Sequence, residues 1–229
     1  MQQKLRAEMV MDFTKWEPIY TEILSSFSFS RVNDEKSARI LASLIHSDAL
    51  PLARARISSA EHEQIIVCGN APCAIDDWYA LISHTESKHR VVIAADGASL
   101  RLYAEGVVPD IIVTDLDGIY DAKETVFAMN KNNTILVIHA HGDNIPLIQS
   151  FVPLCPGPII CTTQSQPFSN LHNFGGFSDG DRAVFFAHAL GAKRVLLCGF
   201  DLDDSEVDPI KRKKLIWARK LLGMLGYLV

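Results

Sequence analysis

The chain has 229 residues, of which 48% are hydrophobic and 21% are charged, and its formal net charge at pH 7 is −5. Such a chain can bury a large core, which excludes disordered and collagen-like proteins. Because it lacks the excess of lysine and arginine that drives binding to phosphate backbones, no nucleic-acid partner is expected.

Targeting and redox features indicate a cytoplasmic protein. No run of residues approaches the roughly 18 apolar positions that a membrane span needs, and residues 1–20 carry charges where a signal peptide would be apolar. The five cysteines are odd in number and show no C-x-x-C spacing, so neither a disulfide framework nor a structural zinc site is expected. We therefore also expect no membrane partner.

Residues 1–63 predict a small N-terminal helical region. Apolar residues recur at helical spacing over residues 16–24 and again over residues 41–45. Asn33 is the expected N-cap of the second helix, and Pro51 is expected to break a third. This region contains no motif with recognisable chemistry.

Residues 64–229 predict an α/β catalytic domain that ends in a helix. Six short apolar runs, at residues 65–68, 91–95, 111–113, 135–138, 159–161 and 195–198, alternate with longer helix-compatible stretches. The runs are continuous, as in strands that are buried on both faces, so we expect a three-layer, Rossmann-like, mostly parallel sheet of about six strands. Gly106 and Gly191 stand at expected helix ends, and Asp121 with Glu124 resembles a capping box.

Three aspartates follow two of the predicted strands, and ligands bind beyond the carboxyl ends of strands in such a sheet. Asp96 follows the second run, and Asp115 and Asp117 follow the third. On an extended strand, residues two apart face the same side, so Asp115 and Asp117 should point into one crevice. Adjacent carboxylates repel one another unless a cation lies between them, and oxygen ligands suit Mg²⁺. An isolated D-x-D more often caps a helix, but Asp96 at a second strand end favours a metal site.

A glycine-rich, acidic segment precedes the apolar helix before the last run. Gly175 and Gly176 allow backbone N–H groups to approach a ligand, and Ser178 with Asp179 opens a helix whose N-terminus suits phosphate. Helix capping alone explains Asp179 better than Asp181, because one cap residue is enough.

The other strand ends provide polar loops. They comprise Gly69 and Asn70 after the first run, Gly97 and Ser99 after the second, His139, His141, Asp143 and Asn144 after the fourth, and Thr163 and Gln164 after the fifth. The two histidines lack a third soft ligand for a transition metal, so they either contact a phosphate or heterocycle or are structural. The loop after the fifth run can form hydrogen bonds with the edge of a ring. The basic run at residues 211–214 is a solvated helix face unless it brings a lysine to a triphosphate.

Seven motifs carry a resemblance to a known family. In chain order they are G-N-A-P, A-D-G-A, T-D-L-D-G, H-A-H-G-D-N, T-T-Q, G-G-F-S-D-G-D-R-A and C-G-F-D. From about Gln64 onwards the sequence resembles the archaeal-type 6-hydroxymethyl-7,8-dihydropterin pyrophosphokinase family, which is related to the thiamine pyrophosphokinases. The resemblance implies an enzyme that transfers diphosphate from ATP to the hydroxymethyl oxygen of a reduced pterin and releases AMP, in folate or methanopterin biosynthesis.

The resemblance also implies a site. It assigns Mg²⁺ ligands to Asp96, Asp115, Asp117 and Asp181, with Asp179 as a further candidate, and catalytic roles to Asp115, Asp117 and Asp181. We expect ATP and the pterin to bind at the polar loops named above, together with Gly175, Gly176 and Ser178. Related folds often dimerise, so a homodimer is a further expectation.

Three other functions remain compatible with the residues. A thiamine-type pyrophosphokinase is disfavoured because A-D-G-A replaces D-G-G, and because Phe177 or Ser178 replaces a lysine that is common in those enzymes. A glycosyltransferase would use the D-x-D motif to hold a metal-bound nucleotide sugar. A non-catalytic nucleotide-binding module would bind Mg-nucleotide without turnover.

Overall fold

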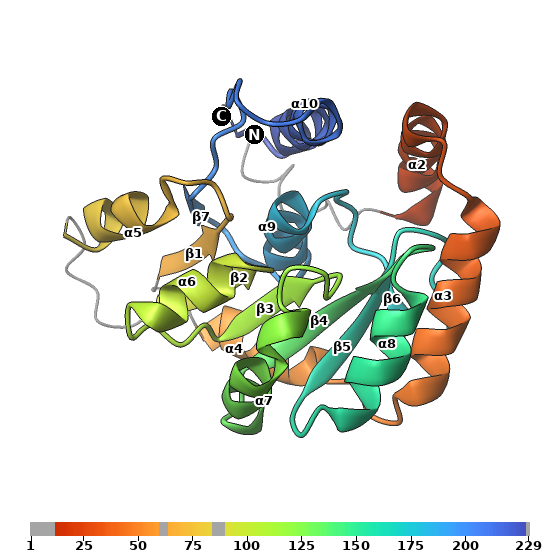
Figure 1. Cartoon of the computed structure of the whole chain (residues 1–229), viewed down its shortest axis with the longest axis horizontal. Coiled ribbons are helices and arrows are strands. Elements are labelled where there is room, and N and C mark those ends of the chain that lie inside the picture. Colours follow the sequence, from red (N-terminus) through yellow and green to blue (C-terminus); the bar gives the residue numbers. More distant parts are fainter. Residues whose placement is uncertain (1–11, 60–63, 84–89, 228–229) are drawn as a thin grey trace.

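The computed structural model describes residues 12–59, 64–83 and 90–227. They form a three-layer α/β fold around a seven-stranded sheet with the strand order β6-β5-β4-β3-β2-β1-β7, in which all strand pairs are parallel (Figure 1). The strands are β1 (Gln64–Cys68), β2 (Arg90–Ala95), β3 (Ile111–Thr114), β4 (Ile135–Ala140), β5 (Ile159–Thr163), β6 (Leu171–His172) and β7 (Val195–Cys198). The predicted fold class is confirmed, and each of the six runs forms a strand. The additional strand, β6, has two residues, which is too short to be visible as an apolar run.

Helices cover both faces of the sheet (Figure 1). They are α2 (Phe13–Phe27), α3 (Arg31–Leu44), α4 (Leu50–Ser59), α5 (Ala74–Ser83), α6 (Ala98–Ala104), α7 (Lys123–Lys131), α8 (Ile145–Phe151), α9 (Asp179–Ala189) and α10 (Pro209–Met224). One hydrophobic cluster joins the sheet to α2, α4, α9 and α10. Two more clusters join the opposite face to α3, α7 and α8, and to α5 and α6.

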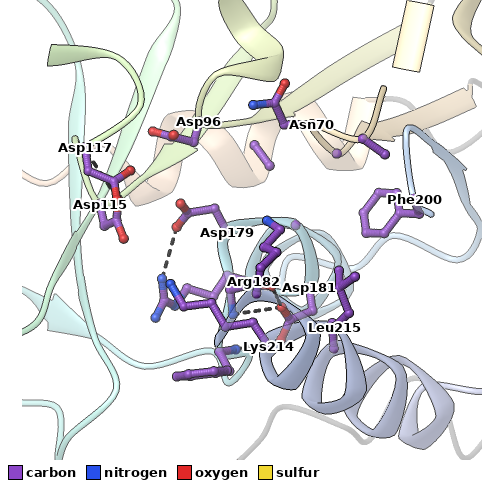
Figure 2. Close-up of a pocket in the computed structure, with 18 of the residues that line it drawn as sticks. Asn70, Asp96, Asp115, Asp117, Asp179, Asp181, Arg182, Phe200, Lys214 and Leu215 are labelled. Carbon is purple, nitrogen blue, oxygen red and sulfur yellow. Dashed lines mark hydrogen bonds and ion pairs between the residues drawn. The ribbon is translucent and has the colours of Figure 1, made fainter. Parts of the chain in front are cut away.

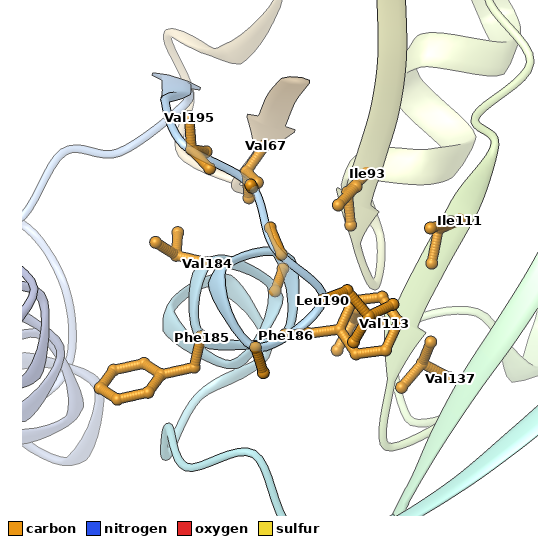
Figure 3. Close-up of a cluster of buried hydrophobic side chains, with 14 of the residues drawn as sticks. Val67, Ile93, Ile111, Val113, Val137, Val184, Phe185, Phe186, Leu190 and Val195 are labelled. Atoms are coloured by element: carbon orange, nitrogen blue, oxygen red, sulfur yellow. The ribbon is translucent and has the colours of Figure 1, made fainter. Parts of the chain in front are cut away.

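The packing of α9 positions the site. Alternate residues of each strand face opposite layers, and the residues facing α9 meet its Val184 and Phe186 (Figure 3). On the strand side these residues include Val67, Ile93, Val113 and Val137. Because this contact is fully buried, it fixes how far α9 extends along the sheet. The helix consequently begins beside the carboxyl ends of β2 and β3. There the charges of Asp115 and Asp96 contribute to a raised pKa of Asp179.

The N-terminal helices share their core with the sheet. Trp16, Tyr20 and Ile23 are fully buried in the cluster that also contains strand residues. Pro51 does not break the third helix, because it lies in the first turn of α4, where a missing N–H costs nothing. The N-cap of α3 is Ser30 rather than Asn33, which lies within the helix. The division into residues 1–63 and 64–229 stays a prediction, since residues 1–11 and 60–63 lie outside the described part.

The predicted helix ends are mostly present. Gly106 and Gly191 follow α6 and α9 with φ of 77° and 105°, as glycines do after helices. The predicted capping box at Asp121 and Glu124 is wrong. Asp121 lies in a short 3₁₀ turn, and α7 begins after Ala122 without a side-chain cap. Among the described residues, no helix is both long and apolar enough to cross a membrane.

Candidate active site

A cavity of about 580 Å³ lies beyond the carboxyl ends of the central strands, between the start of α9 and α10 (Figure 2). Many of the residues expected from the sequence line it: Gly69, Asn70, Asp96, Asp115, Asp117, His141, Asp143, Asn144, Gln164, Ser178, Asp179 and Asp181. The cavity therefore collects side chains that are far apart in the chain.

Asp96, Asp115 and Asp117 form an acidic triad in this cavity. Each residue contributes one carboxylate oxygen to a group of three oxygens that all lie within 4.8 Å of one another. Three hard oxygen donors at this spacing fit a divalent cation such as Mg²⁺. Within the described ranges, this is the one group of three or more acidic, histidine or cysteine side chains close enough to hold a metal ion.

The pKa values of the triad diverge. Burial, with the charges of Asp115 and Asp117, raises the pKa of Asp96 to about 6, although a hydrogen bond from Thr114 opposes the rise. Burial and the charge of Asp115 also raise the pKa of Asp117. For Asp115, burial acts upward, but the hydrogen bond and charge of His141 and the charge of Arg182 outweigh it and lower the pKa. The triad thus holds negative charge that a cation would stabilise.

The raised pKa of Asp96 predicts pH-dependent stabilisation by Mg²⁺. The ordinary pKa of an aspartate is 3.8, and that of Asp96 is raised to about 6. Without metal, the contribution of Asp96 to the stability of the folded state is therefore greatest below about pH 3.8 and is lost as the pH rises through about 6. Mg²⁺ binds the ionised carboxylate, so the gain in Tm on adding Mg²⁺ should be larger at about pH 7.5 than at about pH 5. Thermal denaturation with and without Mg²⁺ measures both values, and Asp96→Asn is the control that should flatten the difference. An equal Mg²⁺ effect at both pH values would contradict this prediction.

Thr114 joins the two strand ends that carry the triad. Its buried hydroxyl donates to Oδ1 of Asp96 at 2.6 Å and accepts from the backbone N–H of Leu116 at 2.8 Å. Asp96 has φ of 47°, and its carbonyl accepts from the hydroxyl of Ser99 at 2.7 Å. Ser99 is therefore a residue of the turn that holds Asp96.

Asp115 and Asp117 meet through a turn, contrary to the expectation of strand alternation. Strand β3 ends at Thr114, and Leu116 has φ of 83°. The backbone N–H of Asp117 donates to Oδ1 of Asp115 at 3.3 Å, which is the side-chain bond of an Asx turn. Both side chains still line the cavity, although the reason differs from the predicted one.

Gly118 leaves the space that Asp96 occupies. A Cβ atom at position 118 would overlap with Oδ2 of Asp96, so Gly118→Ala must displace this carboxylate. We expect kcat/KM to fall by about tenfold, because small misplacements of a catalytic group are costly. Gly223→Ala is the control, since nothing lies within 4 Å of its added Cβ. Equal steady-state rates for both variants would contradict the prediction.

The first turn of α9 separates the roles of its two aspartates. Oδ1 of Asp181 accepts hydrogen bonds from the backbone N–H and the hydroxyl of Ser178, and Oδ2 accepts from the backbone N–H of Phe177 at 2.6 Å. Asp181 is fully buried and completes a capping box with Ser178. Asp179 instead pairs with Arg182 at 3.0 Å and points towards the triad (Figure 2). Burial and the charge of Asp115 raise the pKa of Asp179.

Asn144 holds the loop after β4 in place. Its side-chain N–H₂ donates to the carbonyls of Asp115 and His139, at 2.8 and 2.7 Å. Its oxygen accepts from the hydroxyl of Ser37 at 3.2 Å and the backbone N–H of His141 at 3.1 Å. This network places Nε2 of His141 3.3 Å from Oδ2 of Asp115.

Six of the residues expected to bind ATP or the pterin do not line this cavity. His139, Thr163 and Gly175 line a separate space of about 10 Å³, which Arg182 also lines. Burial strongly lowers the pKa of His139, so it is neutral. Gly97, Ser99 and Gly176 line neither space, and Gly176 instead lets its loop pack against the backbone of Arg182.

Several cavity residues were not expected from the sequence. They include Phe29, Arg182, Phe200 and Leu215. Lys211 and Lys214 also line the cavity, so the basic run does reach it, and the charge of Lys214 opposes the rise in the pKa of Asp117. Arg182 and Phe200 both lie in motifs quoted above, G-G-F-S-D-G-D-R-A and C-G-F-D, whereas Phe29 lies in none and looks like an ordinary core residue.

Comparisons with known proteins agree on one family. A family model described as 6-hydroxymethylpterin diphosphokinase MptE-like matches residues 39–207. A protein of Methanothermobacter thermautotrophicus named 6-hydroxymethyl-7,8-dihydropterin pyrophosphokinase is 40% identical, over 94% of this chain and 95% of the relative. Proteins of the same name from Pyrococcus furiosus and Methanocaldococcus jannaschii are 34% and 33% identical; each alignment covers 94% of this chain, and 94% and 96% of those relatives.

Proposed function

The chain belongs to the 6-hydroxymethylpterin diphosphokinase MptE-like family, and from this premise we propose that it transfers diphosphate from ATP to the hydroxymethyl oxygen of 6-hydroxymethyl-7,8-dihydropterin, releasing AMP. The acidic triad supports the proposal most directly, since its carboxylates converge in the main cavity. In such a transfer the hydroxyl attacks the β-phosphorus and AMP leaves in line, so the protein positions two substrates and balances charge.

Asp96, Asp115 and Asp117 are the proposed Mg²⁺ ligands, because their oxygens have the right chemistry and spacing. Bound there, the cation would neutralise charge on the polyphosphate of ATP. We propose Asp179 rather than Asp181 as the fourth acidic group, because both oxygens of Asp181 accept bonds from the start of α9.

Arg182, Lys211 and Lys214 are the proposed phosphate-binding cations. Arg182 is 7% exposed, lines the cavity and is oriented by Asp179. Its Nε atom has no hydrogen-bond partner in the part of the chain that is described. A guanidinium held in this way can donate to phosphate oxygens without first being ordered. The two lysines add charge from α10 across the cavity.

Acceptor choice tests the proposed function. With Mg-ATP, the chain should release AMP in the presence of 6-hydroxymethyl-7,8-dihydropterin and not with thiamine. Release of AMP with thiamine alone, consumption of a nucleotide sugar, or binding of ATP without turnover would each contradict the proposal. A cytoplasmic location and a homodimer stay predictions, which cell fractionation and light scattering test.

A further inference from the structure

The residues that line the cavity extend on both sides of the acidic triad, and the two parts of the cavity are called its recesses below. The triad follows β2 and β3, while β4 and β5 lie on one side of these strands and β1 and β7 on the other. An in-line transfer places the attacking and leaving oxygens on opposite sides of the phosphorus. If the proposed function holds, each recess should therefore receive one of the two heterocycles.

The recess on the β4–β5 side is lined by Phe29, Phe177, Leu147 and Gln164. Phe29 and Phe177 belong to an aromatic cluster with Phe27, with ring centroids 4.8 to 6.4 Å apart. Aromatic and aliphatic walls with one buried polar group are typical of sites for flat heterocycles.

Gln164 is that polar group, and its orientation is fixed. It is 2% exposed, and its Nε2 donates to Oδ2 of Asp34 at 2.8 Å. Its Oε1 has no hydrogen-bond partner among the described residues. A buried acceptor without a partner costs free energy, and a ring N–H would satisfy it.

Asp34 supports Gln164 from the N-terminal helices. Besides Gln164, it accepts from the hydroxyl of Tyr20 at 2.6 Å and from the backbone N–H of Gly142 at 2.8 Å. The indole N–H of Trp16 donates to the carbonyl of Gln164 at 2.8 Å. The helices that contain no recognisable motif thus hold both loops that border this recess.

The opposite recess suits the nucleotide. Phe200 lies there on the far side of the cavity from Asp115 and Asp117 (Figure 2), with its ring close to Gly69 and Gly180. On α10, Lys211, Lys214, Leu215 and Ala218 line the cavity at the spacing of one helix face. This face offers apolar contact and positive charge together, as a base that carries a polyphosphate requires.

We propose that the β4–β5 recess binds the pterin ring, with Oε1 of Gln164 accepting from its N–H edge and Asp34 acting as the positioning residue for Gln164. A pterin presents its 2-amino group and N3–H side by side, so both can donate to the two lone pairs of Oε1, whereas the amino group of adenine is flanked by ring nitrogens that are acceptors and would repel this oxygen. This assignment rests on the proposed function and specifies where the acceptor binds.

Crossed kinetics of two variants test the assignment. Gln164→Met keeps the side-chain volume and removes the acceptor, so KM for the pterin should rise about tenfold with KM for ATP within about twofold. Phe200→Leu, on the nucleotide side, should raise KM for ATP instead. The reverse pattern, or a Gln164→Met effect on kcat alone, would overturn the assignment.

A substrate analogue separates recognition from folding. The wild type should discriminate against the lumazine analogue, which lacks the 2-amino group, and Gln164→Met should lose most of this discrimination. If Gln164→Met does not fold, Phe29→Leu replaces it, with the same expected rise in KM for the pterin alone. If the wild type forms no AMP with the pterin, the proposed function fails, and calorimetric binding of the pterin to wild type and Phe29→Leu decides the recess by itself.

Discussion

Asp115→Asn should lower kcat by about 10³-fold while leaving the fold intact. Asp115 has the lowest pKa of the triad because His141 and Arg182 favour its ionised form, so it is the carboxylate most certain to carry charge. An amide keeps the shape but removes that charge, and losses of this size follow when electrostatic stabilisation is removed from an active site. Steady-state release of AMP measures the change.

Thermal denaturation without metal is the control for Asp115→Asn. His141 and Arg182 stabilise the ionised carboxylate of Asp115 in the folded state, so removing this charge should lower Tm at neutral pH, with a cooperative unfolding transition retained. His141→Gln, which removes the partner of Asp115, should cause a smaller loss of activity. A near wild-type rate for Asp115→Asn would contradict the assigned role.

Asparagine substitutions at the two aspartates of α9 should have different effects, one on activity and the other on stability. Asp179→Asn should lower kcat by about 10²-fold with little change in stability, because it removes charge beside the triad and weakens the ion pair that orients Arg182. Asp181→Asn should lower the free energy of unfolding by about 1 to 3 kcal/mol, because an amide cannot accept all the hydrogen bonds that the capping box requires.

Paired denaturant titrations and rate measurements separate these outcomes. The folded fraction of Asp181→Asn should retain a rate within about tenfold of wild type. The carboxylate of Asp181 accepts hydrogen bonds at the start of α9 and is therefore not expected to contact substrate. A large loss of activity in fully folded Asp181→Asn, with an active Asp179→Asn, would restore Asp181 as the ligand implied by the family resemblance.

The sequence predicted the triad because topology alone brings its members together. Parallel strands end at one edge, so Asp96 after β2 and Asp115 after β3 were expected at the same edge, and the pairing of β2 with β3 makes them neighbours. The turn at Leu116 was not predictable, since a non-glycine residue at positive φ is rare. It did not change the outcome, because the turn and an extended strand both direct Asp115 and Asp117 into the cavity.

The sequence did not predict the long-range contacts of the site. Asp34 and Gln164 are 130 positions apart and meet only when α3 packs beside β5. Phe29 lies in none of the motifs, and Phe200 lies in C-G-F-D, but a phenylalanine after a buried strand is also typical of a core residue, so neither was expected to line the cavity. Ser178 and Asp181 are three positions apart, which is the spacing of a capping box, so the sequence contained the signal for the structural role of Asp181, although Asp179 was expected to be the capping residue.

A crystal structure with Mg²⁺ and the α,β-methylene analogue of ATP would locate the cation and the nucleotide. We expect a cation held by carboxylate oxygens of Asp96, Asp115 and Asp117, phosphates against Arg182, and the adenine on the side of Phe200. A nucleotide bound away from the triad, or a cation held by other residues, would contradict this expectation.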